Sequence, residues 1–366
     1  MQLVPGIDEL IKSLNSASEK ERAFAAEDLG YENSDESVSA LVERLQVEDS
    51  RFVREVIVNA LKSMDTPLLI NTVVSLLYSD DAFTRNSAID ILARLGDKAV
   101  DGIRPLLADP SKDVRKFVLD IAFHIGGAEA KAVLAEALSD PEVNNVITAV
   151  EYLGRLESTE YTDRINELLR STGNLLLRCT CLEALARIGD ETSQEIVTRL
   201  YPDYESIGEL EKYSYLKFIA GKGTRDHLPL LLSFMREKGP LMVKEIINAL
   251  EGILQRNGYD LLPSELLSEI VHFIGSPIND INRYELLVLL GEYKNPEIYS
   301  LFLRYLQPEN KLACLGAVEG LGLYGNRDAV TYLNNLRQHT HDDELLEAIE
   351  RSLELLRGRG GDCWAD

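Results

Sequence analysis

The sequence predicts an all-α protein built as a tandem stack of about eleven helical hairpins. Three observations predict this fold: a basic residue recurs about every 30 residues, two amphipathic stretches fill each interval, and turn residues separate the stretches. A hairpin of about 30 residues cannot cover its own apolar face. Neighbouring hairpins must therefore stack and share one continuous core.

The recurring residue, called here the basic slot, is arginine in five of the first six repeats. The slot falls at positions 22, 54, 85, 115, 145 and 178, so the intervals are 32, 31, 30, 30 and 33 residues, and Asn145 is the exception to arginine. Further along, Lys212, Lys244, Arg283 and Lys311 lie near the same slot at less regular intervals. We expect a single solenoid over residues 1–356, with regular repeats over 1–190 and divergent repeats over 191–356.

Each repeat contains two stretches with apolar residues at i, i+3, i+4 and i+7, the spacing of an amphipathic helix. The second stretch contains the slot. The first stretches are residues 7–14, 38–47, 68–78, 99–108, 130–138 and 161–169. Asp-Pro pairs at 109–110 and 140–141 suit the turn between the helices. Glycines are expected to end the second helix as left-handed caps, at Gly30, Gly96, Gly126 and Gly189.

The segments Asp-Pro-Ser-Lys-Asp-Val-Arg at 109–115 and Ala-Leu-Ala-Arg-Ile-Gly at 184–189 resemble the HEAT repeat. The similarity is to the short bacterial type, also called the phycobilisome (PBS) lyase HEAT-like repeat, and extends over nearly the whole chain. It implies a right-handed α-α superhelix of the armadillo-like kind. The same repeat serves bilin lyases, enzyme scaffolds and signalling adaptors, so the resemblance does not fix the function.

Helix geometry predicts that the slot arginines are buried and paired. At 100° per residue, the residues three, four and seven after the slot lie within about 60° of it, on the core side of the helix. A buried guanidinium needs an acidic partner, and the turn acids are the candidates. The resemblance implies a comparable Asp and Arg ladder. The predicted structural ladder consists of Arg22, Arg54, Arg85, Arg115 and Arg178 with Asp80, Asp109 and Asp140.

Residues five and nine after the slot are expected to face away from the core, at about 140° and 180°. They pair an acid with a base four residues later, a spacing worth about 0.2–0.5 kcal/mol on exposed helices. One interpretation is a solvated face. The other is a polar concave surface that binds a partner protein, formed by Asp90, Arg94, Asp120, His124, Glu183 and Arg187, with Glu151 and Arg155 displaced by one position.

The region from 199 to 215 is irregular and rich in tyrosine, a residue enriched at binding hot spots. We predict a docking patch of Tyr201, Tyr204 and Tyr213, with a packing adjustment as the alternative, and assign Tyr215 to the core. The glycine-rich tail at 357–366 is expected to be flexible. It contains Cys363 and the only tryptophan, Trp364, so it is either a frayed end or a short docking peptide.

No catalytic residue, metal ligand or cofactor is predicted. The five histidines are scattered, and no His-Glu pair has the spacing that binds iron in HEAT-like hydroxylases. The segment 339–343 contains possible metal ligands, although an acidic helix start explains it as well. Neither a P-loop nor a nucleophile elbow is present.

Charge narrows the class of partner. The chain has 38 basic and 61 acidic residues, a net charge of −23, which disfavours nucleic acid and anionic membranes and favours a basic protein. The four cysteines form no CxxC pair, as expected in a reducing cytoplasm. Neither a signal peptide nor a membrane span is expected.

These features predict a non-catalytic, cytoplasmic scaffold or adaptor that binds a protein on its concave face, as a monomer or weak dimer. The resemblance alone provides the alternative, a bilin lyase or isomerase subunit acting on phycobiliproteins.

Overall fold

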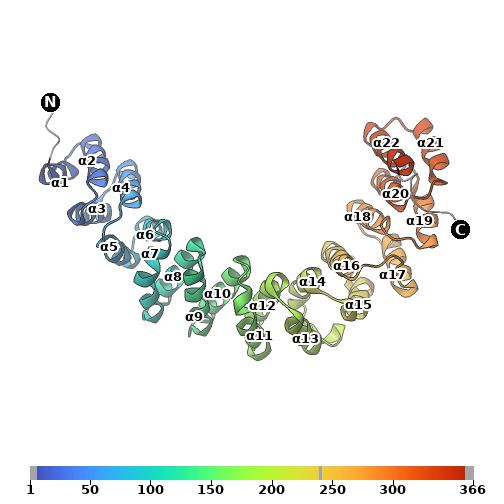
Figure 1. The fold of residues 1–366 in the computed structure, drawn as a ribbon, viewed down its shortest axis with the longest axis horizontal. Coiled ribbons are helices and arrows are strands. Elements are labelled where there is room, and N and C mark those ends of the chain that lie inside the picture. Colours follow the sequence, from blue (N-terminus) through green and yellow to red (C-terminus); the bar gives the residue numbers. More distant parts are fainter. Residues whose placement is uncertain (1–5, 239–240, 359–366) are drawn as a thin grey trace. The chain divides into compact units, whose positions relative to one another are not determined.

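The computed structural model describes residues 6–238 and 241–358, and its regular secondary structure is helical throughout that part of the chain (Figure 1). The predicted all-α hairpin fold is confirmed: the described residues form 22 α-helices, which pair into eleven hairpins. The tail residues 359–366, including Cys363 and Trp364, lie outside the described residues. The chain divides into two compact units, Met1–Ile165 and Asn166–Asp366.

The boundary between the units falls inside α11 (Thr162–Ser171). The other helices of unit 1 are α1 (Ile7–Leu14), α2 (Glu19–Glu32), α3 (Asp35–Val47), α4 (Arg51–Ser63), α5 (Leu69–Ser75), α6 (Ala82–Arg94), α7 (Asp97–Ile103), α8 (Lys112–Ile125), α9 (Ala128–Glu136) and α10 (Val143–Arg155). Those of unit 2 are α12 (Leu175–Ile188), α13 (Glu191–Leu200), α14 (Glu211–Lys222), α15 (Leu228–Lys238), α16 (Val243–Asn257), α17 (Ser264–Gly275), α18 (Asp280–Leu290), α19 (Pro296–Tyr305), α20 (Lys311–Tyr324), α21 (Ala329–His339) and α22 (Asp343–Gly358).

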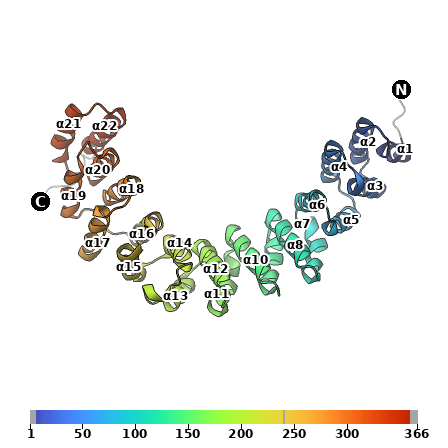
Figure 2. The same ribbon diagram turned by 180° about the vertical axis from the view of Figure 1, so that it is seen from behind.

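Within each unit the even-numbered helices, which are the second helices of the hairpins, pack side by side. In unit 1 this row contains α2, α4, α6, α8 and α10, while α3, α5, α7 and α9 form the row of first helices (Figures 1 and 2). In unit 2 the second helices run from α12 to α22 in the same manner. A residue on one second helix therefore neighbours a residue about one repeat later in the chain.

The core lies between the two rows of each unit. Leu29, Leu41, Leu45, Ile57 and Leu61 are fully buried in the first two hairpins, and equivalent aliphatic residues recur in later ones. Burying each such side chain contributes about 1.5–3 kcal/mol. The predicted first stretches match the first helices, although three of them end in a 3₁₀ turn, at Leu76–Tyr78, Arg104–Ala108 and Ala137–Ser139.

Two of the four predicted glycine caps are wrong. Gly30 lies inside α2, where a side chain would clash with Ala60 of α4, so this glycine permits close helix packing. Gly189 follows α12 with φ of −59°, outside the left-handed region. Gly126 is the left-handed cap of α8 as predicted, with φ of 72°.

Candidate protein-binding surface

The basic residue at the slot can join one hairpin to the next through its side chain. Arg115 Nε lies 2.7 Å from Asp140 Oδ2, and its Nη2 lies 2.9 Å from Asp140 Oδ1. The same guanidinium donates through Nη1 to the backbone oxygen of Asp109, 2.9 Å away, in its own turn. Burial disfavours the charged Asp140 carboxylate, but the hydrogen bonds from Arg115, the Glu142 N–H and Asn145, together with the charge of Arg115, outweigh burial and lower the Asp140 pKa. This arginine therefore fastens two consecutive turns.

Three more slot arginines also reach an acid of the next hairpin. The pairs are Arg22 with Glu48 (2.8 Å), Arg54 with Asp81, and Arg178 with Glu211 (2.9 Å). The Glu48 side chain is fully buried and also accepts from Arg44 and from the Ser50 N–H. Burial alone would raise the pKa of Glu48, but these hydrogen bonds lower it to about 2.

Two of the predicted ladder acids do not pair with an arginine. Asp80 is exposed, and Arg54 instead pairs with its neighbour Asp81, which caps α6 by accepting from the Thr84 N–H. The Asp109 carboxylate accepts from the Tyr78 hydroxyl at 2.5 Å, while Arg85 donates to the Ser79 carbonyl at 2.6 Å. The Tyr78 hydroxyl thus occupies the position at Asp109 where the sequence analysis predicted an arginine guanidinium.

In unit 2, which also contains the Arg178 pair, the slot residue Lys311 continues the ladder. Lys311 Nζ lies 2.8 Å from both Asp342 and Glu344, so Asp342 is held by an ion pair while it caps α22 through the Leu345 N–H. The described residues include no group of three or more His, Cys, Asp or Glu that could hold a metal ion.

The second-helix face, defined by the predicted residues Asp90, Arg94, Asp120, His124, Glu151, Arg155, Glu183 and Arg187, is partly occupied by contacts between hairpins. Asp120 accepts from the Tyr152 hydroxyl of α10 at 2.7 Å, and Asp90 pairs with Lys62 of α4. Glu183 accepts from Ser214 and Lys217 of α14, each at 2.9 Å. These acids therefore link neighbouring second helices within each unit, Asp90 and Asp120 in unit 1 and Glu183 in unit 2.

Only one of the four predicted pairs on this face forms between side chains. Arg155 Nη1 lies 3.3 Å from Glu151 Oε1, with both side chains about half exposed. His124 Nδ1 lies 2.7 Å from the Asp120 backbone oxygen instead of the carboxylate. Arg94, His124 and Arg187 are exposed and available to a partner.

The predicted docking patch of three tyrosines is wrong in part. Tyr201 is only 1% exposed, because its hydroxyl lies between Glu211 (2.7 Å) and Arg178 (3.2 Å) inside the hairpin. Tyr204 is half-buried beneath Lys212, whose Nζ is 3.9 Å from the ring centroid. Tyr213 is 42% exposed and remains a candidate contact residue, and Tyr215 is a core residue as predicted.

The structure adds exposed apolar residues that the sequence interpretation missed. We define the turn edge of unit 2 as five exposed apolar residues near the starts of successive second helices, beside which Leu175, the first residue of α12, is also exposed. They are Leu176, Leu210, Leu241, Ile281 and Leu312, exposed by 59%, 71%, 79%, 60% and 36%. Three of them, Leu176, Leu210 and Ile281, lie two residues before the slot, a position outside the core pattern. That recurrence is the signal that sequence analysis could have used.

The described thiols have the environment of structural cysteines. Burial raises the pKa of Cys181 to about 12 and that of Cys314 to about 11, and burial also raises the pKa of Cys179. A thiol with a raised pKa is a poor nucleophile at neutral pH.

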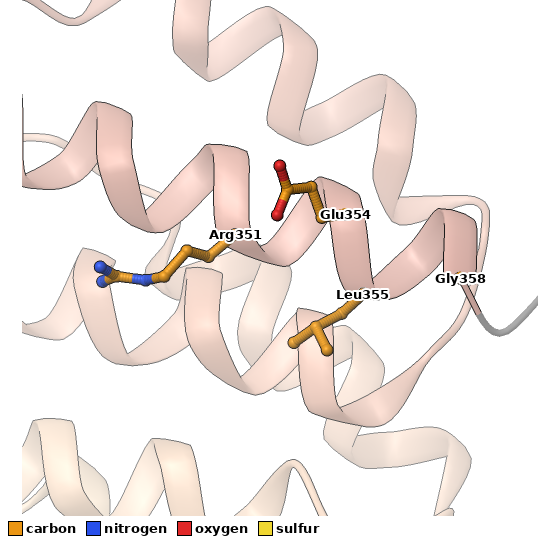
Figure 3. A pocket seen from close by; sticks show the side chains of 4 residues that line it. All are labelled: Arg351, Glu354, Leu355 and Gly358. Atoms are coloured by element: carbon orange, nitrogen blue, oxygen red, sulfur yellow. The ribbon is translucent and has the colours of Figure 1, made fainter.

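An open hollow of about 460 Å³ lies on the last helix, α22 (Figure 3). Among the residues that the structure describes, Arg351, Glu354, Leu355 and Gly358 of this helix line the hollow. Small-ligand sites enclose their ligand and converge polar groups on it, so this hollow does not have the form of such a site. No helix of the described residues is long and apolar enough to cross a membrane.

The comparisons with known proteins agree with this architecture. The family model for HEAT repeats matches residues 7–93 and 70–151. No curated protein matches the chain. A mutant of Kap121p is similar in structure at a TM-score of 0.55 and 12% identity, over 96% of this chain and 45% of that one. Kap121p bound to Nup53p gives 0.54, with the same identity and coverage.

The chain thus spans less than half the length of these Kap121p structures. The complex of CpcE and CpcF of phycocyanin lyase from Nostoc sp. PCC7120 aligns with 69% of this chain and 96% of that one at 19% identity. Its TM-score of 0.28 is too low to indicate a shared fold. Both units therefore have the hairpin fold of an α-solenoid, and residues 7–151 are identified as HEAT repeats.

Proposed function

We propose that the protein is a non-catalytic scaffold that binds a protein partner on the part of the second-helix face that lies in unit 1. The observation that supports this most is the set of contacts that holds the face in place. In unit 1, Asp120 accepts a hydrogen bond from Tyr152 and Asp90 pairs with Lys62, each across neighbouring second helices. A surface held in this way loses little conformational entropy on binding, which favours affinity.

Exposed charges on this fixed surface provide the selectivity. Asp90, Arg94, Glu151 and Arg155 lie at the solvent side of α6 and α10. Charged groups of this kind mainly set the choice of partner and the association rate. The net charge of −23 favours a basic partner. Kap121p, which shares the hairpin fold, has been crystallised with Nup53p, Ste12p and Pho4p, so protein binding is compatible with this fold.

The test compares charge reversals on the two rows of unit 1. Asp90→Lys with Glu151→Lys alters the second-helix face, whereas Asp101→Lys with Glu129→Lys alters the first helices to the same extent. The wild-type protein and both variants are used for quantitative affinity purification from native extract followed by mass spectrometry. We expect the first variant to lose a specific partner by roughly tenfold or more, as for a hot-spot contact. Equal recovery with all three proteins would contradict the second-helix face as the binding surface.

A further inference from the structure

A buried histidine occupies the position of a helix start that usually carries a glutamate. Thr224 and His227 form a capping box at the 3₁₀ turn Arg225–His227, which leads directly into α15. In the usual motif, Ser or Thr is followed three residues later by Glu or Gln, whose side chain accepts from the backbone N–H of the first residue. Here His227 Nδ1 accepts from the Thr224 N–H at 3.0 Å. The acceptor at this helix start is therefore a group that titrates near neutral pH.

The other ring nitrogen of His227 joins this helix start to the preceding hairpin. His227 Nε2 lies 3.3 Å from Thr198 Oγ1 in α13. The Thr198 hydroxyl donates to the Gln194 carbonyl at 2.8 Å. Because the hydroxyl proton is directed to this carbonyl, the hydroxyl oxygen accepts from an Nε2–H. Both ring contacts therefore require the same neutral tautomer, with a proton on Nε2 and none on Nδ1.

The surroundings of the ring disfavour a positive charge. His227 is 3% exposed, and its ring centroid lies 6.3 Å from that of Phe218 in α14. Among the described residues, the charged groups that act on the ring are Asp226 in its own turn and Arg256 of α16. Burial lowers the pKa of His227 and Arg256 lowers it further, and together they outweigh the opposing effects of Asp226 and the Thr224 backbone. The ring is therefore neutral at pH 7.

A proton on Nδ1 would break the capping box. The protonated nitrogen is a donor, so the Thr224 N–H would face another N–H instead of a lone pair. The new charge would also be repelled by Arg256, whose guanidinium donates to the Gly223, Ala220 and Ile219 carbonyls at the end of α14. A glutamate in the same position would remain an acceptor at pH 5, since its ordinary pKa is about 4.3. The histidine thus makes this helix start sensitive to mild acid.

We propose that the contacts of His227 with Thr224 and Thr198 form an acid-sensitive latch, which holds the start of α15 against α13 near neutral pH and releases it between about pH 6.5 and pH 5. The sign follows from the neutral ring of the folded state. The unfolded chain binds the proton at an ordinary pKa of about 6.5, so the stabilisation is complete above that pH and is lost as the pH falls below it. Both helices belong to unit 2, so the latch does not depend on the second-helix face of unit 1.

Ring titration and amide exchange test the latch in the full chain. The Cε1–H resonances of the five histidines are followed by NMR from pH 8 to pH 4.5 and are assigned by replacing each histidine by glutamine in turn. We expect His227 to remain neutral to a lower pH than the exposed His272. Hydrogen exchange, corrected for its intrinsic pH dependence, should show that the amides of residues 225–231 lose about tenfold in protection between pH 7 and pH 5. A His227 titration at or above pH 6.5, or unchanged protection, would overturn the proposal.

Two matched substitutions separate the latch from general acid sensitivity. His227→Gln keeps an acceptor at the capping-box position but does not titrate in this range, so protection of the same amides should be equal at pH 7 and pH 5. His272→Gln changes an exposed histidine of α17 and should lose protection as the wild type does. An equal loss in the wild type and His227→Gln would refute the latch. If His227→Gln does not fold, the wild-type ring titration decides, since the other four variants identify the His227 resonance by elimination. The Asp90→Lys with Glu151→Lys variant should keep the acid response, so the two proposals fail separately.

Discussion

The Arg115 guanidinium in α8 forms two parallel hydrogen bonds with the Asp140 carboxylate in the turn before α10. Their side chains are 9% and 3% exposed. Charge-assisted pairs with this geometry are strong and directional. Together with the bond from Arg115 to the Asp109 carbonyl, the pair fixes the position of one hairpin on the next.

Removing this arginine should destabilise unit 1 strongly. Arg115→Ala leaves the buried Asp140 carboxylate without its main partner, at an expected cost of about 3–5 kcal/mol. Arg94→Ala, which truncates an exposed arginine two helices earlier in the chain, should change stability by less than about 0.5 kcal/mol. Urea unfolding with hydrogen exchange across α8 to α10 measures both. Similar midpoints for the two variants would show that the ladder is not a stabilising device.

Acid should weaken the contact between the first two hairpins. The Glu48 pKa is lowered from 4.5 to about 2 in the folded state, so its contribution is fully present above about pH 4.5 and is lost as the pH falls towards 2. Between pH 7 and pH 3 the wild type should lose on the order of 2 kcal/mol through this group.

The Glu48→Gln variant tests this assignment. It should be less stable than the wild type at pH 7 but lose less stability on acidification. The control Glu43→Gln, at an exposed position of α3, the helix that ends just before Glu48, should follow the wild-type pH dependence. Parallel curves for wild type and Glu48→Gln would assign the acid sensitivity to other carboxyl groups.

Close packing of α12 and α14 should make Gly221 sensitive to enlargement. A side chain at Gly221 would collide with the backbone of Ala186, so Gly221→Ala should cost about 1–3 kcal/mol. Gly173 has nothing within 4 Å of an added side chain. We expect Gly173→Ala to be nearly neutral in thermal unfolding; a neutral Gly221→Ala would mean that the two helices can separate without cost.

Tyr201 should prove to be structural. Tyr201→Phe removes the hydroxyl between Arg178 and Glu211, and we expect a cost of about 1–3 kcal/mol. The exposed Tyr31→Phe is the control and should have little effect. If Tyr201→Phe were neutral for stability but reduced partner recovery, the docking patch of the sequence prediction would be restored.

The repeat pattern was sufficient to predict the hairpins and a ladder that contains Arg115 and Asp140, but it did not specify which acid each arginine contacts. It could not choose between Asp80 and Asp81, because the choice depends on which acid caps α6. It also could not predict that Tyr201 is buried, since this depends on how residues 202–210 fold around Glu211. Leu176 and Leu210 were missed because a residue at a helix start belongs to neither face of the helical period.

The direction of the arginine ladder has a consequence for synthesis on the ribosome. The pairs of Arg22, Arg54 and Arg115 run to acids located 26, 27 and 25 residues later. Each guanidinium therefore leaves the exit tunnel well before its carboxylate. The last arginine of a nascent chain therefore lacks its acidic partner until the next turn has emerged. Pauses in translation after each acid would let one ion pair form before the next hairpin emerges.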